Sequence, residues 1–262
     1  MKYVVDHDYH IHSYISSCSG DPLQTPERIL QYAKDNGLKK ICLTDHFWDE
    51  RVEGASNWYR PQDFSHISAA LPLPQDDGVE FVFGCETELN KELTLGLSRE
   101  MCDKFGFIII PTTHLHMKNF TIDEGATLED RAEAYVTRLE SVLDMDLPFH
   151  KIGIAHLTCS LIARDPKGAY LTVIDMVSDE DFERLFTKAA RVGVGIELNF
   201  DPNLSEEDME RGLRPYRIAK RCGCKFYVGS DAHHERELHT CYQRLCRMVE
   251  LLELEESDKF NF

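Results

Sequence analysis

Short, nearly continuous hydrophobic runs recur along the chain, separated by stretches in which hydrophobic residues return at helical spacing. Runs of this kind are typical of strands buried on both faces, as in a parallel sheet covered by helices. We expect seven strands, near residues 3–12, 39–45, 80–86, 105–113, 151–156, 192–199 and 225–230.

The stretches between these runs predict helices, and the first is the clearest. Thr25 is a candidate N-cap, Pro26 suits the first helical position, and Gly37 can end the helix in the left-handed conformation. Further helices are expected at residues 127–144, 178–193, 214–221 and 235–255. The alternation of strands and helices predicts an α/β fold, either a barrel or an open sheet, with right-handed crossovers.

The chain shows no internal repeat and no linker, so residues 1–262 are expected to form one domain. The least regular segment spans residues 48–77 and contains Trp48, Trp58 and Tyr59, followed by the turn-rich sequence LPLPQDDG. A long loop of this kind can cover the mouth of a barrel and carry specificity, or it can be a surface insertion that never touches substrate. The sequence leaves both interpretations open.

The charge of the chain narrows the class of ligand. There are 46 acidic residues against 29 basic ones, which gives a net charge of −17. Such a field disfavours long nucleic acids, whose affinity comes largely from phosphate neutralisation by Lys and Arg. A local cluster of metal ions can still attract a small phosphorylated substrate.

The nine cysteines include no CxxC pair, and several lie inside hydrophobic runs. This usage favours free thiols in a reducing compartment, so a cytoplasmic location is expected. No hydrophobic stretch reaches the length of a membrane span, and residues 1–13 lack the hydrophobic core of a secretion signal.

Histidines and acidic residues gather where the hydrophobic runs stop. Residues i and i+2 of a strand face the same side, so two such side chains can reach one ion. This spacing occurs near both ends of the chain, and the first and last strands of a closed barrel are neighbours, so the two pairs are expected to converge. Imidazoles and carboxylates collected from many strand ends are typical of a multi-metal hydrolytic site. The residues are His10, His12, His46, Glu86, His114, His156, Asp231 and His233.

Each motif is weak when taken alone. With 12 histidines, an HxH pair arises easily by chance, and His114 and His116 form a second one. Histidines that are simply hydrogen-bonded at a strand end are the plain alternative. We prefer Glu86 to Glu88 because Glu86 directly ends its run, and His114 to His116 as a ligand. Cys18, in the loop HSYISSCSG, is either a thiolate ligand or a free thiol.

Taken together and in this order, HxH, TDH, GCE, two strand-end histidines and GSDAH resemble the PHP (polymerase and histidinol phosphatase) family, from Tyr9 to His233. The stand-alone phosphoesterases of that family, which include histidinol-phosphatase-like enzymes, are more similar than the polymerase-fused branch. The resemblance implies a distorted (β/α)7 TIM-like barrel. It also implies two or three divalent metal ions, which are zinc, manganese or iron in this family.

The resemblance further implies how the ligands divide among the ions. One site would comprise His10, His12, Glu86 and Asp231. In a second site, Glu86 would bridge to an ion held by His114 and His156. A third would use His46 and His233, with Cys18 at a position where many family members have histidine. This departure leaves open whether the third site prefers a softer ion or stays empty.

The activity implied by the resemblance is hydrolysis of a small phosphate monoester by a metal-bound hydroxide. Asp45 and Asp231 are the candidate catalytic carboxylates. Asp45 is expected to steer a ligand histidine, although it can also cap the segment that follows it. Arg60, Lys118 and Arg164 lie in loops after strands and are candidate phosphate-binding residues, with solvated surface charges as the plain alternative.

Three other functions remain open at this stage. An amidohydrolase also carries HxH on its first strand, but no lysine ends a strand here to bridge metals. A nucleotide or oligonucleotide phosphodiesterase is disfavoured by the acidic charge. A metal-binding domain without activity is disfavoured because eight of the nine expected ligand positions match the family. The chain contains no GxSxG, P-loop or GxGxxG motif, and the sequence does not indicate an oligomeric state.

Overall fold

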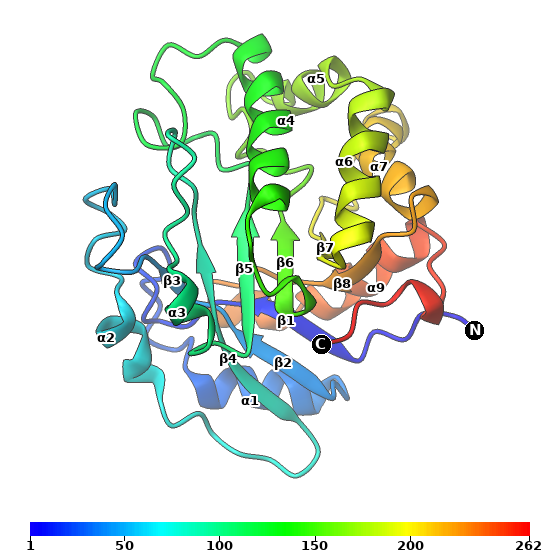
Figure 1. Ribbon diagram of the computed structural model, residues 1–262. Coiled ribbons are helices and arrows are strands. Elements are labelled where there is room, and N and C mark those ends of the chain that lie inside the picture. The colour runs from blue at the N-terminus through cyan, green and yellow to red at the C-terminus, as the bar shows by residue number, and fades with distance from the viewer.

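Every pair of neighbouring strands in the sheet is parallel, as the buried hydrophobic runs predict. The computed structural model describes residues 1–262 (Figure 1). The strand order is β1-β2-β4-β5-β6-β7-β8, and the short β3 pairs with β4. The strands are β1 (His7–Ile11), β2 (Lys40–Leu43), β3 (His46–Phe47), β4 (Glu80–Thr87), β5 (Phe107–Pro111), β6 (Ile152–Ala155), β7 (Gly195–Leu198) and β8 (Lys225–Val228).

The sheet closes where residues following β8 meet the end of β1. Ile11 and Ala232 form a parallel bridge. The amide of Asp231 donates to the carbonyl of His10 at 2.7 Å, and the amide of His12 donates to the carbonyl of Ala232 at 3.1 Å. The result is a nearly closed barrel of parallel strands, which confirms the expected distorted (β/α)7 TIM-like fold.

Helices cover the outside of the barrel (Figure 1). The cap of the first was predicted correctly, since the Thr25 hydroxyl accepts from the amide of Arg28. The longest helix begins with a capping box between Thr127 and Asp130. The helices are α1 (Pro26–Asp35), α2 (Phe64–Ile67), α3 (Arg99–Cys102), α4 (Leu128–Asp144), α5 (Ala169–Met176), α6 (Asp179–Val192), α7 (Glu206–Arg221), α8 (Glu235–Leu238) and α9 (Cys241–Leu251).

Several boundaries differ from the prediction. The helix expected at 214–221 begins earlier, because Ser205 caps it and its first turn is acidic; Pro215 lies inside it. The helix expected at 235–255 is two helices, separated at residues 239–240. Helix α5 and strand β3 were not predicted, since α5 starts from Gly168 without a side-chain cap and β3 is only two residues long.

The interior of the barrel is filled with aromatic side chains. Tyr9, Phe107 and Tyr227 pack together, and Phe260 and Phe262 pack against them. The amide of Phe260 donates to the carbonyl of Phe226 at 2.8 Å. This packing closes the axis of the barrel below the strand ends that carry the histidines, so a polar site can form only above it.

A register shift between Asp8 and Ile11 interrupts the pairing of β1 with β2. Irregularities of this type re-aim side chains along a strand. Tyr9 packs in the aromatic interior while the adjacent His10 contacts Glu86 and Glu197, both deep in the barrel. The shift therefore allows consecutive residues to serve the core and the site.

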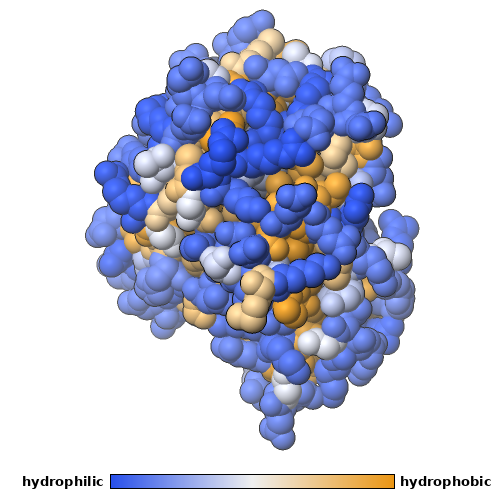
Figure 2. All heavy atoms as spheres, turned by 90° about the vertical axis from the view of Figure 1, so that its right-hand side faces the viewer, coloured by the Kyte–Doolittle hydropathy of each residue, from blue (hydrophilic) through white to orange (hydrophobic).

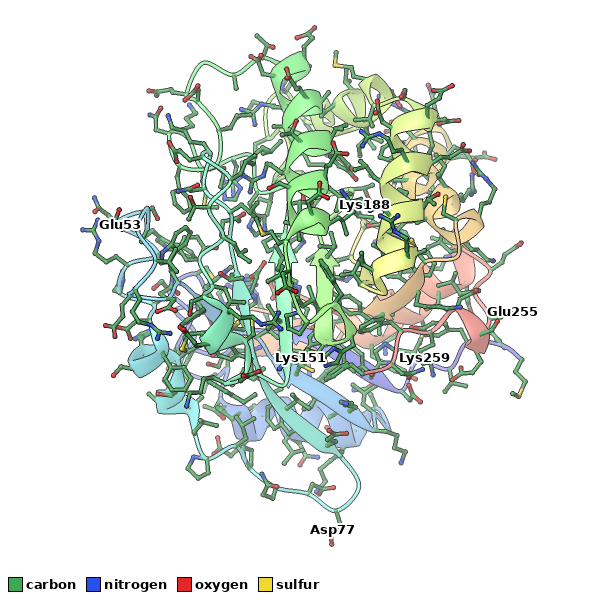
Figure 3. The ribbon with its side chains drawn as sticks, in the orientation of Figure 1. Glu53, Asp77, Lys151, Lys188, Glu255 and Lys259 are labelled. Carbon is green, nitrogen blue, oxygen red and sulfur yellow. The ribbon has the colours of Figure 1, made fainter.

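The irregular segment at residues 48–77 contains α2 and a short 3-10 helix. Trp48 and Tyr59 are buried, whereas Glu53 and Asp77 project outward (Figure 3). The segment is thus anchored by aromatic residues and presents acidic residues to solvent.

The face of the molecule in Figure 2 is mostly hydrophilic, with hydrophobic residues visible in recesses between polar groups. None of the helices combines the length and the hydrophobicity that a membrane span requires.

Candidate metal centre

The strand-end residues singled out in the sequence converge at the carboxyl ends of the strands. They lie on six of the parallel strands or directly after them, and β1 and β8 each contribute two residues. His10 lies on β1, His46 on β3 and Glu86 on β4. His12, His114, His156, Asp231 and His233 follow the ends of β1, β5, β6 and β8.

Glu86 lies at the centre of this cluster and its two oxygens face different imidazoles. Oε2 is 3.4 Å from His10 Nε2, 3.2 Å from His12 Nε2 and 3.0 Å from His46 Nδ1. Oε1 is 3.5 Å from His156 Nε2 and 4.0 Å from His114 Nε2. A carboxylate arranged in this way can serve ions on both of its sides.

Asp231 divides its oxygens in a similar manner. Oδ1 is 3.4 Å from His10 Nε2 and 3.2 Å from His12 Nε2, and Oδ2 is 3.8 Å from His156 Nε2. The two pairs of residues from opposite ends of the chain therefore meet, as their spacing predicts.

Unsatisfied polar atoms at the centre show that these residues fit metal ions. Both oxygens of Glu86 and Nε2 of His114 are buried and have no hydrogen-bond partner. Buried polar atoms without a partner are costly, so such a group needs a ligand. Imidazole nitrogens and carboxylate oxygens are the donors that zinc-like ions prefer. The ligand atoms of His10, His12 and Asp231 lie within 4.8 Å of one another, as do those of Glu86, His114 and His156.

Four of the imidazoles are oriented in the same way. Nδ1 lies near an oxygen of the protein, which leaves Nε2 to face the site. For His10 that oxygen belongs to Glu197, at 2.6 Å, and for His114 to Glu88, at 2.9 Å. For His12 it is the hydroxyl of Ser16, at 3.0 Å, and for His233 the carbonyl of Asp231, at 2.7 Å.

Asp45 is placed behind His12. Its carboxylate accepts from the amide and hydroxyl of Ser13, both at 2.7 Å, and from the hydroxyl of Ser16 at 2.8 Å. Because the Ser16 hydroxyl donates its proton to Asp45, its oxygen is free to accept a hydrogen bond from His12 Nδ1. Asp45 can therefore steer His12 through Ser16, and the distance of 3.9 Å to His12 leaves no direct hydrogen bond.

The supporting roles of Glu197 and Glu88 were not predicted from the sequence, in which Glu88 was considered only as an alternative to Glu86. Glu197 on β7 is fully buried, and besides His10 it accepts from the amide of His156 at 3.2 Å. Glu88 lies behind His114 and is held by Arg138, whose Nη2 donates to it at 2.7 Å. Glu88 is therefore not a competitor of Glu86. The only sequence signal for Glu197 is a single acidic residue inside the hydrophobic run GVGIEL.

The electrostatics of the cluster favour ionised carboxylates. Burial opposes ionisation of Glu86, yet His46 and His10 hold the pKa of its carboxyl well below the usual value. Burial lowers the pKa of His114 to about 3, which keeps that imidazole neutral. The pKa of His12 is raised to about 9, because the carboxylates of Asp231 and Glu86, each 3.2 Å from its Nε2, outweigh the cost of burying its charge. An incoming metal ion must therefore displace a proton from His12.

The backbone is strained at two of the ligand positions. His156 has φ 62° and Asp231 has φ 53°, a region that residues other than glycine rarely adopt. Each conformation is held by a hydrogen bond from the residue's own amide, to Glu197 and to the carbonyl of His10 respectively. Strain retained in this way is commonly found at functional sites.

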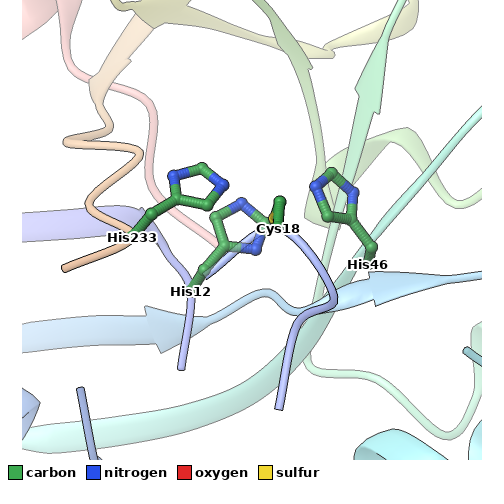
Figure 4. Close-up of side chains that lie close together, drawn as sticks. All are labelled: His12, Cys18, His46 and His233. Atoms are coloured by element: carbon green, nitrogen blue, oxygen red, sulfur yellow. The ribbon is translucent and has the colours of Figure 1, made fainter. Parts of the chain in front are cut away.

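A further cluster brings Cys18 together with three histidines. The ligand atoms of His12, Cys18, His46 and His233 lie within 4.8 Å of one another (Figure 4). Cys18 comes from the loop after β1 and its residue is exposed. The structure thus places the thiol beside the two histidines with which the sequence grouped it, and adds His12 to the set.

A cavity of about 520 Å³ opens above these residues. Lys118 and Arg164 line it, whereas Arg60 is exposed and lies outside the lining. The structure therefore does not bring Arg60 to the site as expected. His116 lines the cavity without joining a ligand cluster.

The irregular segment at residues 48–77 contributes to the same cavity. Ser56, Trp58 and Tyr59 are among its lining residues. Of the two interpretations left open by the sequence, this placement favours a loop that covers the mouth of the barrel.

Comparisons with known proteins bear on family and fold. The PHP domain model matches residues 8–199. No curated protein sequence matches this chain significantly. The structure of a histidinol phosphate phosphatase from Lactococcus lactis, complexed with zinc, L-histidinol and phosphate, is similar with TM-score 0.58 and 17% identity, covering 98% of this chain and 99% of that one. A protein assigned as a histidinol phosphatase from Listeria monocytogenes gives TM-score 0.61 and 13% identity, covering 92% and 100%.

Proposed function

This chain belongs to the PHP family of metal-dependent phosphoesterases, and we propose that it hydrolyses a small phosphate monoester at the cluster around Glu86. The observation that carries the proposal is the division of Glu86, whose Oε2 faces His10 and His12 while Oε1 faces His114 and His156. A bridging carboxylate of this kind suits ions at the separation used in two-metal phosphoryl chemistry.

The ligands divide into three groups in this proposal. His10, His12 and Asp231 would hold one ion with Glu86, and His114 and His156 a second. The third ion would be held by His46, His233 and Cys18. Divalent ions such as zinc, manganese or iron would supply Lewis acidity that stabilises charge on the phosphoryl group and lowers the pKa of water.

The side chains of the protein have separate roles around these ions. Glu197 and Glu88 fix the tautomers of His10 and His114, so that Nε2 of each faces the site. Asp45 does the same for His12 through Ser16. Preorganised groups of this kind stabilise developing charge without rearrangement during the reaction.

In this proposal, Lys118 and Arg164 bind the phosphate group of the substrate in addition to the metal ions. Both line the cavity, and neither forms a salt bridge within the protein. In a chain with net charge −17, two unpaired cations beside the ion cluster provide a local attraction for an anionic substrate. The Lactococcus lactis structure, which is a complex with zinc, L-histidinol and phosphate, supports a small phosphorylated substrate.

The decisive experiment compares reaction classes on metal-loaded protein. Phosphate monoesters, phosphodiesters and carboxamides are assayed side by side, with Glu86→Ala as the inactive control. We expect release of inorganic phosphate from monoesters and none from the control. Cleavage of amides alone would establish an amidohydrolase instead, and cleavage of diesters alone a phosphodiesterase.

A further inference from the structure

The cavity above the cluster has an aromatic side. Trp58 packs edge-on against His46, with ring centroids 4.9 Å apart, and edge-on against Tyr59 at 4.7 Å. Phe120 follows, with its centroid 5.6 Å from that of Tyr59. Tyr59 is buried, whereas Trp58 is 37% exposed and so retains surface that a ligand can cover. This side of the cavity borders the ligand His46.

The remaining lining is positively charged or neutral. Among the 16 lining residues, the only carboxylates are Glu86 and Asp231, and both belong to the ion cluster. Lys118 and Arg164 supply the other formal charges. No carboxylate of the lining is left to pair with a cationic group on a substrate.

These features define the alcohol that the enzyme accepts. We infer that its preferred substrate is the phosphate monoester of a planar aromatic alcohol that carries no positive charge, and that phosphorylated amino alcohols are poor substrates. This inference rests on the proposed phosphatase function. The ester phosphate would lie at the ions between the two sides of the cavity, with the ring of the leaving group against Trp58.

Charge is the reason for excluding amino alcohols. An ammonium group that leaves water requires a carboxylate or similar acceptor, and the cavity instead places two cations near it. L-Histidinol, which is part of the Lactococcus lactis complex, carries such an amino group. At 17% identity the similarity concerns the fold, so the lining of this cavity decides the specificity.

The test measures kcat/KM of metal-loaded protein at neutral pH for 1-naphthyl phosphate, glycerol 2-phosphate and L-histidinol phosphate. We expect the naphthyl ester to be hydrolysed most efficiently and the histidinol ester least. Equal or better hydrolysis of L-histidinol phosphate would overturn the inference while leaving the phosphatase function intact.

Variants separate the contributions of ring and charge. Trp58→Ala should lower kcat/KM for the naphthyl ester by roughly tenfold, through KM, and change glycerol 2-phosphate little, because only the former covers the indole. The double variant Lys118→Gln with Arg164→Gln should lower kcat/KM for all three substrates. The loss should be smaller for L-histidinol phosphate than for the naphthyl ester. Arg60→Gln is the matched control, an exposed arginine outside the lining. Equal losses for 1-naphthyl phosphate and glycerol 2-phosphate in Trp58→Ala would overturn the role of the ring.

A binding measurement keeps this inference separate from catalysis. Calorimetric titration with 1-naphthylmethylphosphonate, which cannot be hydrolysed, should show binding that Trp58→Ala weakens and Arg60→Gln does not. Binding of the phosphonate without hydrolysis of any monoester would overturn the proposed function and support the recognition of planar ligands. Thermal melting of each variant shows whether it is folded.

Discussion

The backbone amide of Asp231 donates a hydrogen bond to the carbonyl oxygen of His10 at 2.7 Å. This bond joins the first and last strands of the barrel at the residues whose side chains approach each other at 3.4 Å. Closure of the barrel and assembly of the cluster are therefore one structural event. A change that disrupts this hydrogen bond is expected to separate the side chains that are proposed to share one ion.

Removal of the central carboxylate should abolish both activity and metal retention. Glu86→Gln keeps the size of the side chain but leaves only one oxygen able to bind an ion strongly. The content of transition metal in the purified protein, measured by elemental analysis, should fall below the value of more than one equivalent that we expect for the wild type. Glu80→Gln, at the exposed start of the same strand, should retain both properties. Full activity of Glu86→Gln would exclude the bridging role.

Metal affinity should increase with pH. In the metal-free protein the pKa of His12 is about 9, so its imidazole is protonated at neutral pH and must lose that proton to bind an ion. As the pH rises towards that pKa the competing proton is lost, and the apparent affinity rises accordingly. Calorimetry in buffers of different ionisation enthalpy should detect proton release on metal binding. Binding that is independent of pH between 6 and about 9 would contradict this assignment.

The buried carboxylate of Glu197, which contacts His10, should increase the affinity of the site for metal ions. Glu197→Gln removes the negative charge that orients His10 Nδ1 at 2.6 Å. Changes of this type typically lower metal affinity by about 10–100-fold. Competition with a chromogenic chelator measures the change, and the exposed Glu183→Gln provides the control. Unchanged affinity would show that Glu197 serves stability alone.

Metal binding by the Cys18 thiolate should be detectable by absorption spectroscopy when cobalt replaces the natural ion. A thiolate bound to Co(II) gives a charge-transfer absorption in the near ultraviolet that histidine and carboxylate ligands do not produce. We expect this band in the wild-type protein and its loss in Cys18→Ser, while the ions held around Glu86 remain. Cys222→Ser tests another partly accessible thiol that is remote from the clusters. Absence of the band in wild type would mean that Cys18 is a free thiol.

The ion pair between Arg138 and Glu88 should contribute to stability. Arg138 is buried, and besides Glu88 it donates to the carbonyls of Thr112 at 2.8 Å and Leu89 at 3.1 Å. Arg138→Leu leaves a buried carboxylate without its cation and should lower the free energy of unfolding by about 3–5 kcal/mol. Urea denaturation measures this loss. The double variant with Glu88→Gln should recover part of it, and full additivity would contradict the coupling.

The sequence was most informative where chemistry and periodicity coincide. The seven hydrophobic runs predicted the parallel strands, and the polar residues that end them predicted the cluster, because parallel strands present their carboxyl ends together. Capping residues such as Thr25 marked helix starts correctly. These features depend on local sequence, so they can be recognised without knowledge of the fold.

Groups that act through other residues were harder to find. In the sequence, Glu197 is an isolated acidic residue in a strand. Arg138 lies on a helix, and the spacing of its hydrophobic residues does not indicate that a cation is buried there. Their partners, His10 and Glu88, are distant in sequence, so only the folded barrel brings them together. The exclusion of Arg60 from the cavity likewise depends on the path of a long loop.

The aromatic plug formed by Phe260 and Phe262 against Tyr9 and Phe107 has a kinetic consequence. This packing closes the barrel at the amino-terminal ends of the strands, so a ligand can enter and leave only at the opposite end. In the proposed phosphatase reaction, the alcohol and inorganic phosphate would leave by the route through which the ester enters, and release of phosphate would be a step that can limit turnover.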